Sequence, residues 1–212
     1  MNYQAIIFDS DGTLIDSETL GNQVIVECVA ELGLRLTLAE AVAEFRGRKM
    51  GDTLALIEHK LGRALPDDFL PELRRRMALA FEAELKPMPG VPALLERLDV
   101  PFCVASNGPH DKMQVSLRAT GLLRYFSGHV YSAYEIGSWK PEPGLFIHAA
   151  RSLGAEPERC AVVEDSVLGV QAGIAAGMRV FGYAPGGDGE VLAQAGARVF
   201  SHMDELLPLL CG

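Results

Sequence analysis

The sequence predicts an α/β fold in which a Rossmann-like, doubly wound parallel sheet forms the core and an all-helical cap domain is inserted into it. Short apolar runs alternate with helical patterns through most of the chain. The alternation stops once, between about residues 17 and 85, where helical spacing continues without a convincing strand pattern. A chain of 212 residues is long enough for one sizeable core and one smaller attached unit.

Three predicted strands, at 5–8, 102–105 and 161–163, are continuous apolar runs, which is typical of strands covered on both faces. We expect further strands at 179–183 and 197–200 and a shorter one at 129–132, with helices near 91–98, 109–120, 143–152 and 166–176. Sheets of this kind bind their ligands at the carboxyl ends of the strands. Polar clusters at those ends are therefore the first candidates for a functional site.

The inserted segment shows two stripes of apolar residues at helical spacing. One stripe comprises Leu20, Val24, Cys28 and Leu32, and the other comprises Leu70, Leu73, Met77, Phe81 and Leu85. The basic triplet at 74–76 is interpreted as a solvated helix face. The Pro- and Gly-containing run at 86–90 is typical of a hinge. We therefore predict a core of residues 1–15 and 88–212 and a helical cap of residues 16–87.

The formal net charge of −9 argues against nucleic acid or an anionic membrane surface as the main partner. A small anionic substrate is still compatible with this charge, because a local cation can outweigh the global field. No apolar run approaches the roughly 20 residues needed to cross a bilayer, and no signal peptide is visible. The four cysteines form no CxxC pair. These features predict a cytoplasmic protein; they give no indication of its oligomeric state.

The first polar cluster is Asp9-Ser10-Asp11-Gly12-Thr13, directly after the first predicted strand. Carboxylates this close together raise the cost of ionising one another. The pair is therefore useful chiefly to a site that binds a cation or needs one ionised and one protonated acid. The alternative is an ordinary strand-to-turn exit, in which Asp and Gly are common.

Three further clusters lie at or near other strand ends. Ser106-Asn107-Gly108 has the hydroxyl and backbone N–H groups that can hold a phosphate, although a plain helix cap has the same composition. Lys140 follows Trp139 and precedes Pro141, where an ordinary surface lysine is the alternative. Glu164 and Asp165 lie at a helix start, where acidic residues also serve as caps. Together with Asp9 they would form an all-oxygen site of the kind that suits Mg²⁺.

Taken in order, the four clusters resemble the motifs of the haloacid dehalogenase-like hydrolase superfamily, chiefly its phosphatase branch. The resemblance spans nearly the whole chain, and the helical insert resembles the small cap of the subgroup that contains β-phosphoglucomutase and phosphoglycolate phosphatase. Within this subgroup, the stretches 104–109, 112–114 and 139–141 resemble most closely the bacterial phosphatases that act on 6-phosphogluconate.

The resemblance implies a role for each cluster. Asp9 would be the nucleophile that forms an aspartyl-phosphate, and Asp11 the general acid and then base. Mg²⁺ would be held by the Asp9 carboxylate, the Asp11 carbonyl and Asp165, with Glu164 acting directly or through water. Lys140 would offset negative charge at the nucleophile and the phosphoryl oxygens, and Ser106 and Asn107 would orient the phosphoryl group.

The cap is expected to contribute to substrate selection. Arg46, Arg48 and Lys49 match the region where the family's cap reaches over the substrate, although a solvated face is the alternative for each. A basic patch there would suit a second anion on the far end of the substrate. We therefore predict a Mg²⁺-dependent phosphomonoesterase whose small-molecule substrate is a phosphorylated sugar or sugar acid, with 6-phosphogluconate as first choice.

Two other functions are kept as alternatives. A β-phosphoglucomutase-like enzyme would use a cap histidine and a cap arginine at places that hold Gly21 and Met50 here, although Arg48 and Lys49 lie close to the second. A non-catalytic phospho-acceptor or phosphate-binding module would share the sheet and the acidic pocket, but not the helical insert or Asp11. Dehalogenases lack an acid two residues after the nucleophile, so Asp11 favours phosphoryl transfer.

Overall fold

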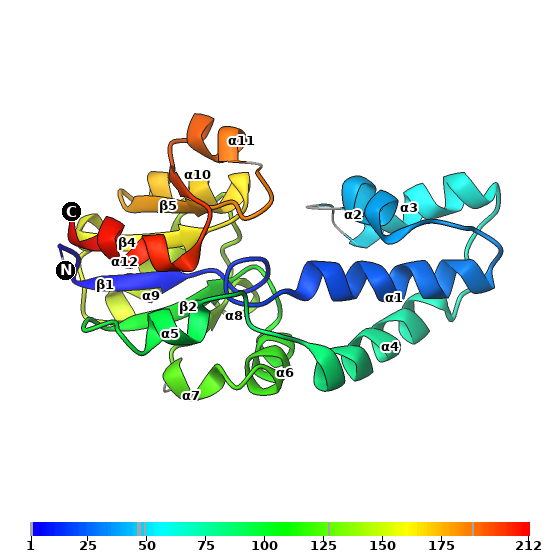
Figure 1. The fold of residues 1–212 in the computed structure, drawn as a ribbon, viewed down its shortest axis with the longest axis horizontal. Helices are drawn as coiled ribbons and strands as arrows, with labels where there is room; N and C mark the ends of the chain where they lie inside the picture. The colour runs from blue at the N-terminus through cyan, green and yellow to red at the C-terminus, as the bar shows by residue number, and fades with distance from the viewer. Residues whose placement is uncertain (1, 46–47, 49, 127, 188) are drawn as a thin grey trace. The chain divides into compact units, whose positions relative to one another are not determined.

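The computed structural model describes residues 2–45, 48, 50–126, 128–187 and 189–212. The chain divides into two compact units (Figure 1), one made of residues 1–15 and 86–212 and the other of residues 16–85. The first unit contains the sheet and the second is helical. No helix in the described part of the chain is long and apolar enough to span a membrane.

A six-stranded sheet with the order β3-β2-β1-β4-β5-β6 lies in the first unit, and all its neighbouring strands are parallel. The chain therefore builds outward from β1 in one direction and then from β4 in the other, which confirms the predicted doubly wound fold. The strands are β1 (Ala5–Phe8), β2 (Phe102–Ser106), β3 (Val130–Ser132), β4 (Cys160–Glu164), β5 (Arg179–Tyr183) and β6 (Arg198–Phe200).

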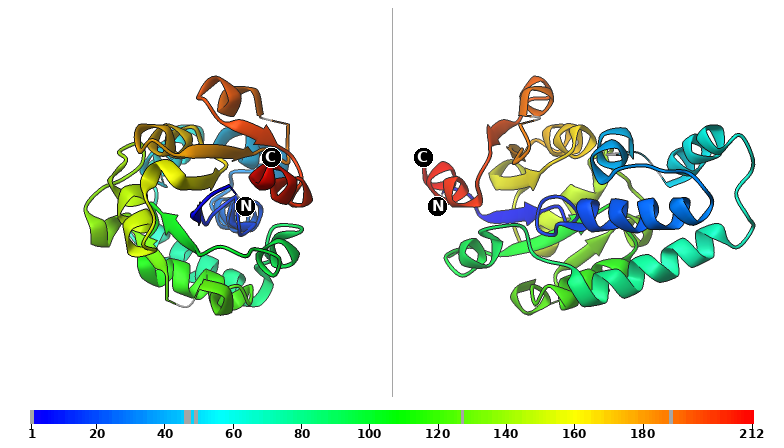
Figure 2. Two further views of the ribbon diagram at one scale, coloured as in Figure 1. Left: turned by 90° about the vertical axis from the view of Figure 1, so that its left-hand side faces the viewer. Right: turned by 45° about the vertical axis from the view of Figure 1, so that its right-hand side comes forward.

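Helices lie on both faces of the sheet (Figure 2), which explains why its central strands are apolar on both sides. One face packs against α9 (Gly144–Ser152) and α10 (Val167–Ala175) through a core that includes Ile7, Ala105 and Val162. The remaining elements of this unit are α5 (Val91–Leu95), α6 (His110–Ala119), α7 (Leu123–Phe126), α8 (Ala133–Ile136), η1 (Pro157–Arg159), α11 (Gly189–Gln194) and α12 (Met203–Cys211).

The regular elements in the described part of the second unit are helices, as the apolar spacing predicts. Its helices are α1 (Ser17–Glu31), α2 (Leu38–Phe45), α3 (Met50–Leu61) and α4 (Phe69–Glu84). Helix α1 packs against both α2 and α4, and its buried Val24 and Cys28 share a core with Leu73 of α4. The two stripes predicted from the sequence therefore face one another inside this unit.

The basic triplet of α4 differs in part from the predicted solvated face. Arg74 and Arg75 are exposed, but Arg76 is only partly so and pairs with Glu31 of α1 as well as with Glu72. Hydrogen bonds from Arg75 and Arg76 lower the pKa of Glu72 to about 2. Arg76 thus links two helices of the unit, a role that sequence spacing within α4 does not reveal.

Candidate active site

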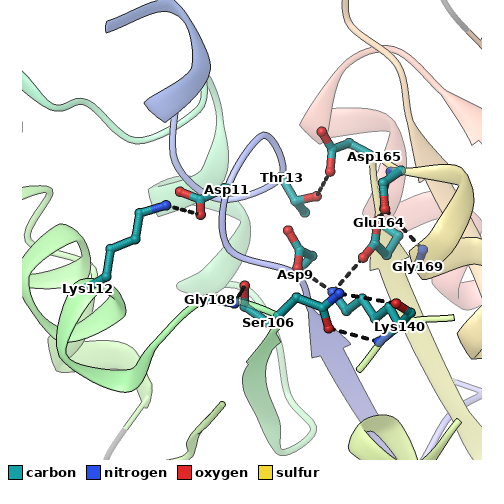
Figure 3. Close-up of polar contacts among 12 residues, drawn as sticks. Asp9, Asp11, Thr13, Ser106, Gly108, Lys112, Lys140, Glu164, Asp165 and Gly169 are labelled. Atoms are coloured by element: carbon teal, nitrogen blue, oxygen red, sulfur yellow. Dashed lines mark hydrogen bonds and ion pairs between the residues drawn. The ribbon is translucent and has the colours of Figure 1, made fainter. Parts of the chain in front are cut away.

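The first predicted motif begins where β1 ends, at the place where the strand order reverses. The backbone N–H of Asp9 donates to the carbonyl of Val163 at 2.9 Å, so the exit of β1 is held against β4. The chain then turns through Gly12, whose φ of +82° favours glycine. This loop therefore presents Asp9 and Asp11 at the carboxyl edge of the sheet (Figure 3), where parallel α/β folds bind ligands.

A buried cluster of charges lies at the centre of this edge. The ammonium of Lys140 is paired with the carboxylate of Asp9 and lies 2.6 Å from Oε1 of Glu164. The side chains of Lys140 and Glu164 are 3% and 1% exposed, so both charges are shielded from water. Lys140 Nζ also lies 4.9 Å from the centroid of the Phe146 ring. Two carboxylates thus share one cation in a buried site.

The surroundings of the cluster disfavour the ionised form of Asp9 but favour the ionised form of Lys140. Burial raises the pKa of Asp9 to about 7, and the negative charge of Glu164 contributes in the same sense against the opposing effect of Lys140. Burial alone would lower the pKa of Lys140, but the charges of Asp9 and Glu164 outweigh it and raise that pKa. Lys140 therefore stays protonated, and its charge is what allows the two carboxylates to be buried together.

The segment carrying Lys140 is held in place by Asn107. The side-chain oxygen of Asn107 accepts a hydrogen bond from the Lys140 backbone N–H at 2.8 Å, and its amide donates to the Lys140 carbonyl at 3.3 Å. Ser106 ends β2, is buried, and accepts from the Gly108 N–H at 3.1 Å. The second predicted motif therefore positions the third, in addition to any contact that it makes with a phosphate.

Glu164 also holds Ser166, the residue that caps the helix that follows. Its Oε2 accepts from the backbone N–H and the hydroxyl of Ser166, each at 2.8 Å, and the Ser166 hydroxyl accepts from Gly169 at the start of α10. A Cβ atom on Gly169 would lie 1.8 Å from Oε1 of Glu164, so only glycine leaves room for this carboxylate. Both Glu164 oxygens thus have protein partners, and the expected metal role of Glu164 stays a prediction.

Asp165 faces the loop of the first motif rather than the buried lysine. Its Oδ1 lies 3.4 Å from the Thr13 hydroxyl, and a Cβ on Gly12 would lie 2.0 Å from its Oδ2. The loop backbone beside Asp11 is therefore packed closely against this carboxylate. Among the described residues, no three His, Cys, Asp or Glu side chains are grouped as a metal site. Carboxylates of Asp9 and Asp165 with a main-chain carbonyl and waters still fit the oxygen ligands that Mg²⁺ prefers.

One contact in this region involves a residue to which the sequence assigned no role. Nζ of Lys112 on α6 donates to Oδ2 of Asp11 at 2.7 Å, and both side chains are partly exposed.

In the helical unit, Arg48 is exposed and its Nε donates to the Glu44 carbonyl at 2.6 Å. The predicted substrate contact of Arg48 stays a prediction. Arg46 and Lys49, the other members of that basic patch, lie outside the described residues.

Comparison with known proteins identifies the class to which this site belongs. The sequence model of the haloacid dehalogenase-like hydrolases matches residues 3–177. The chain belongs to this family, which confirms the resemblance on which the sequence prediction rests.

Individual relatives agree with this assignment. The chain is 35% identical to the 6-phosphogluconate phosphatase of Escherichia coli K12, over 96% of this chain and 92% of that protein. It is 28% identical to a phosphorylated carbohydrates phosphatase of Thermotoga maritima, over 98% of both chains. A family hydrolase of Deinococcus radiodurans R1, solved with bound phosphate and sodium, shares 34% identity and a TM-score of 0.89, covering 99% of this chain and 96% of that one. The protein is a phosphatase.

Proposed function

We propose that this phosphatase hydrolyses a small phosphorylated sugar or sugar acid, with 6-phosphogluconate as first choice, and that it requires Mg²⁺. The observation that carries the proposal is the buried pairing of Asp9 with Lys140 at the carboxyl edge of the sheet. The substrate class is supported by similarity to a 6-phosphogluconate phosphatase and a phosphorylated carbohydrates phosphatase.

In this proposal Asp9 attacks phosphorus and forms an aspartyl-phosphate, while the phosphorus–oxygen bond to the sugar breaks. A carboxylate that approaches a phosphate dianion is repelled by it, so positive charge must be present beforehand. Lys140 supplies one such charge without any reorganisation, because Glu164 and Asn107 already hold it. Ser106 and the Asn107 backbone would orient the phosphoryl group for in-line attack.

Asp11 would protonate the oxygen of the leaving alcohol and then remove a proton from the water that hydrolyses the aspartyl-phosphate. The carboxylates of Asp9 and Asp165 and the carbonyl of Asp11 would hold Mg²⁺, with Glu164 acting directly or through water. The ion would supply further positive charge to offset the negative charge of the reacting groups. The close approach of Gly12 to Asp165 supports this ligand set.

The proposal is tested by a phosphate-release screen over sugar phosphates, sugar-acid phosphates and nucleotides, with and without excess chelator. We expect 6-phosphogluconate to be turned over fastest and activity to fall at least about 10²-fold in chelator, returning with Mg²⁺. Asp165→Asn should require at least about 10-fold more Mg²⁺ for half-maximal rate. Asp99→Asn, an exposed change in the same unit, serves as the control. Full activity in chelator would exclude the metal requirement. Equal turnover of all compounds would exclude the substrate preference.

The role of Asp11 predicts an effect that depends on the leaving group. Asp11→Asn keeps the main-chain carbonyl but removes the proton donor, so turnover of 6-phosphogluconate should fall about 10²- to 10⁴-fold. The loss should be much smaller for p-nitrophenyl phosphate, because p-nitrophenolate leaves without protonation. The measurement is kcat for both substrates in both proteins. Equal losses would show that Asp11 does not act as the general acid.

A further inference from the structure

The side chain of Lys112 has no part in the mechanism above, yet its ammonium is 2.7 Å from the carboxylate of the proposed general acid. We propose that Lys112 is a specificity-determining residue that binds a carboxylate on the substrate's leaving group. The inference rests on the proposed phosphatase function. It names the phosphorylated sugar acids as the substrate class, rather than phosphorylated sugars that have no carboxylate. It assigns their recognition to the unit that contains the sheet.

The position of Lys112 on its helix is the first argument. It lies in the first turn of α6, which begins at His110 and has no side-chain cap on Pro109. A cation in the first turn of a helix is disfavoured by the helix dipole, which favours anions there. The stability of α6 therefore gives no reason for a lysine at this position, whereas an anion in front of the helix does.

The partner of Lys112 is the second argument. Asp11 Oδ2 would contact the leaving oxygen at hydrogen-bond distance, which places Lys112 Nζ within about 5.5 Å of that oxygen. The leaving group would thus begin close to this flexible side chain, which can extend along it to meet a carboxylate at its far end.

The exposure of the ion pair is the third argument. The Lys112 and Asp11 side chains are 43% and 30% exposed, and pairs at such positions are weak. A substrate carboxylate can therefore replace Asp11 as the partner of the ammonium at little cost. The exchange would also release Oδ2 of Asp11 from Lys112 for contact with the leaving oxygen. A phosphate ester whose leaving group is uncharged offers no such replacement.

The experiment compares two substrates that differ only at the end remote from phosphate. 6-Phosphogluconate carries a carboxylate there, and sorbitol 6-phosphate carries a hydroxymethyl group on the same chain of carbons. Lys112→Ala should lower kcat/KM for 6-phosphogluconate about 10- to 100-fold, mainly through KM, and change the value for sorbitol 6-phosphate less than about 3-fold. Lys112→Arg, which keeps the charge, should restore most of the loss.

The control is Arg118→Ala, which removes an exposed cation from the last turn of the same helix and should alter neither substrate. Equal losses on both substrates in Lys112→Ala, or no loss on either, would overturn the inference. The wild-type preference tests the proposed substrate separately. If the wild type does not hydrolyse 6-phosphogluconate, a second matched pair is used, which consists of phosphoglycolate and 2-hydroxyethyl phosphate. The same loss or its absence on this pair then decides the role of Lys112.

Discussion

Replacement of Asp9 with asparagine is expected to abolish turnover, lowering the rate of phosphate release by at least about 10⁴-fold. Asparagine preserves the shape of the side chain but removes the anion that attacks phosphorus. It also removes one of the two charges that hold Lys140. The primary measurement is phosphate release from p-nitrophenyl phosphate and 6-phosphogluconate, and both rates should fall together because the nucleophile is common to both reactions.

A chemical readout separates the role of Asp9 from a folding defect. Wild-type protein quenched in acid during turnover should carry a phosphoryl group on the peptide that contains Asp9, and the Asp9→Asn protein should carry none. Asp99→Asn should behave like the wild type in both assays. Substantial turnover by Asp9→Asn, or phosphorylation at another residue, would remove Asp9 from the proposed mechanism.

Lys140→Met is expected to cost both activity and stability. The side chain keeps its approximate length, but Asp9 and Glu164 then face each other in a buried site without a cation. Leaving a buried charge without its partner costs about 3–5 kcal/mol in the free energy of unfolding. Turnover should fall at least about 10³-fold, because the nucleophile loses the charge that offsets the phosphate. Urea denaturation and phosphate release measure the two effects, and exposed Lys86→Met is the control.

A second substitution distinguishes the two effects of Lys140→Met. Adding Glu164→Gln removes one of the stranded carboxylate charges, while the amide oxygen can still accept from Ser166. We therefore expect the double variant to regain part of the lost stability but none of the lost activity. If Lys140→Met alone is as stable as the wild type, the lysine does not neutralise the cluster.

The central strands were the most predictable part of the fold. Continuous apolar runs located β1, β2 and β4, because burial on both faces leaves these strands without polar alternation. The short helices α7, α8 and α11 were not predicted, since four to six residues are too few to show helical spacing. Helix α12 was also not predicted, and it contains Pro208, which normally indicates a helix end.

The candidate site was predictable where its residues follow strands directly. Asp9, Ser106, Glu164 and Asp165 lie at or just after strand ends, so the parallel topology alone brings them to one edge. The partners of Lys140 could not be derived in this way, because its loop is positioned by the Asn107 side chain, 33 positions away in the sequence. The contact between Lys112 and Asp11 joins residues 101 positions apart and has no spacing signal.

The hydrogen bonds that Glu164 accepts from both Lys140 and Ser166 have a consequence for local unfolding. One of its oxygens accepts from the ammonium of Lys140, and the other accepts from Ser166, which caps the first turn of α10. This turn cannot fray without disturbing the partner of the lysine, and the lysine cannot leave without exposing a buried carboxylate at the helix start. The charge cluster and the end of α10 should therefore open as one cooperative unit, with amide protection close to that of the central strands. The chemistry of this protein would then depend on one of its most slowly exchanging regions rather than on a mobile loop.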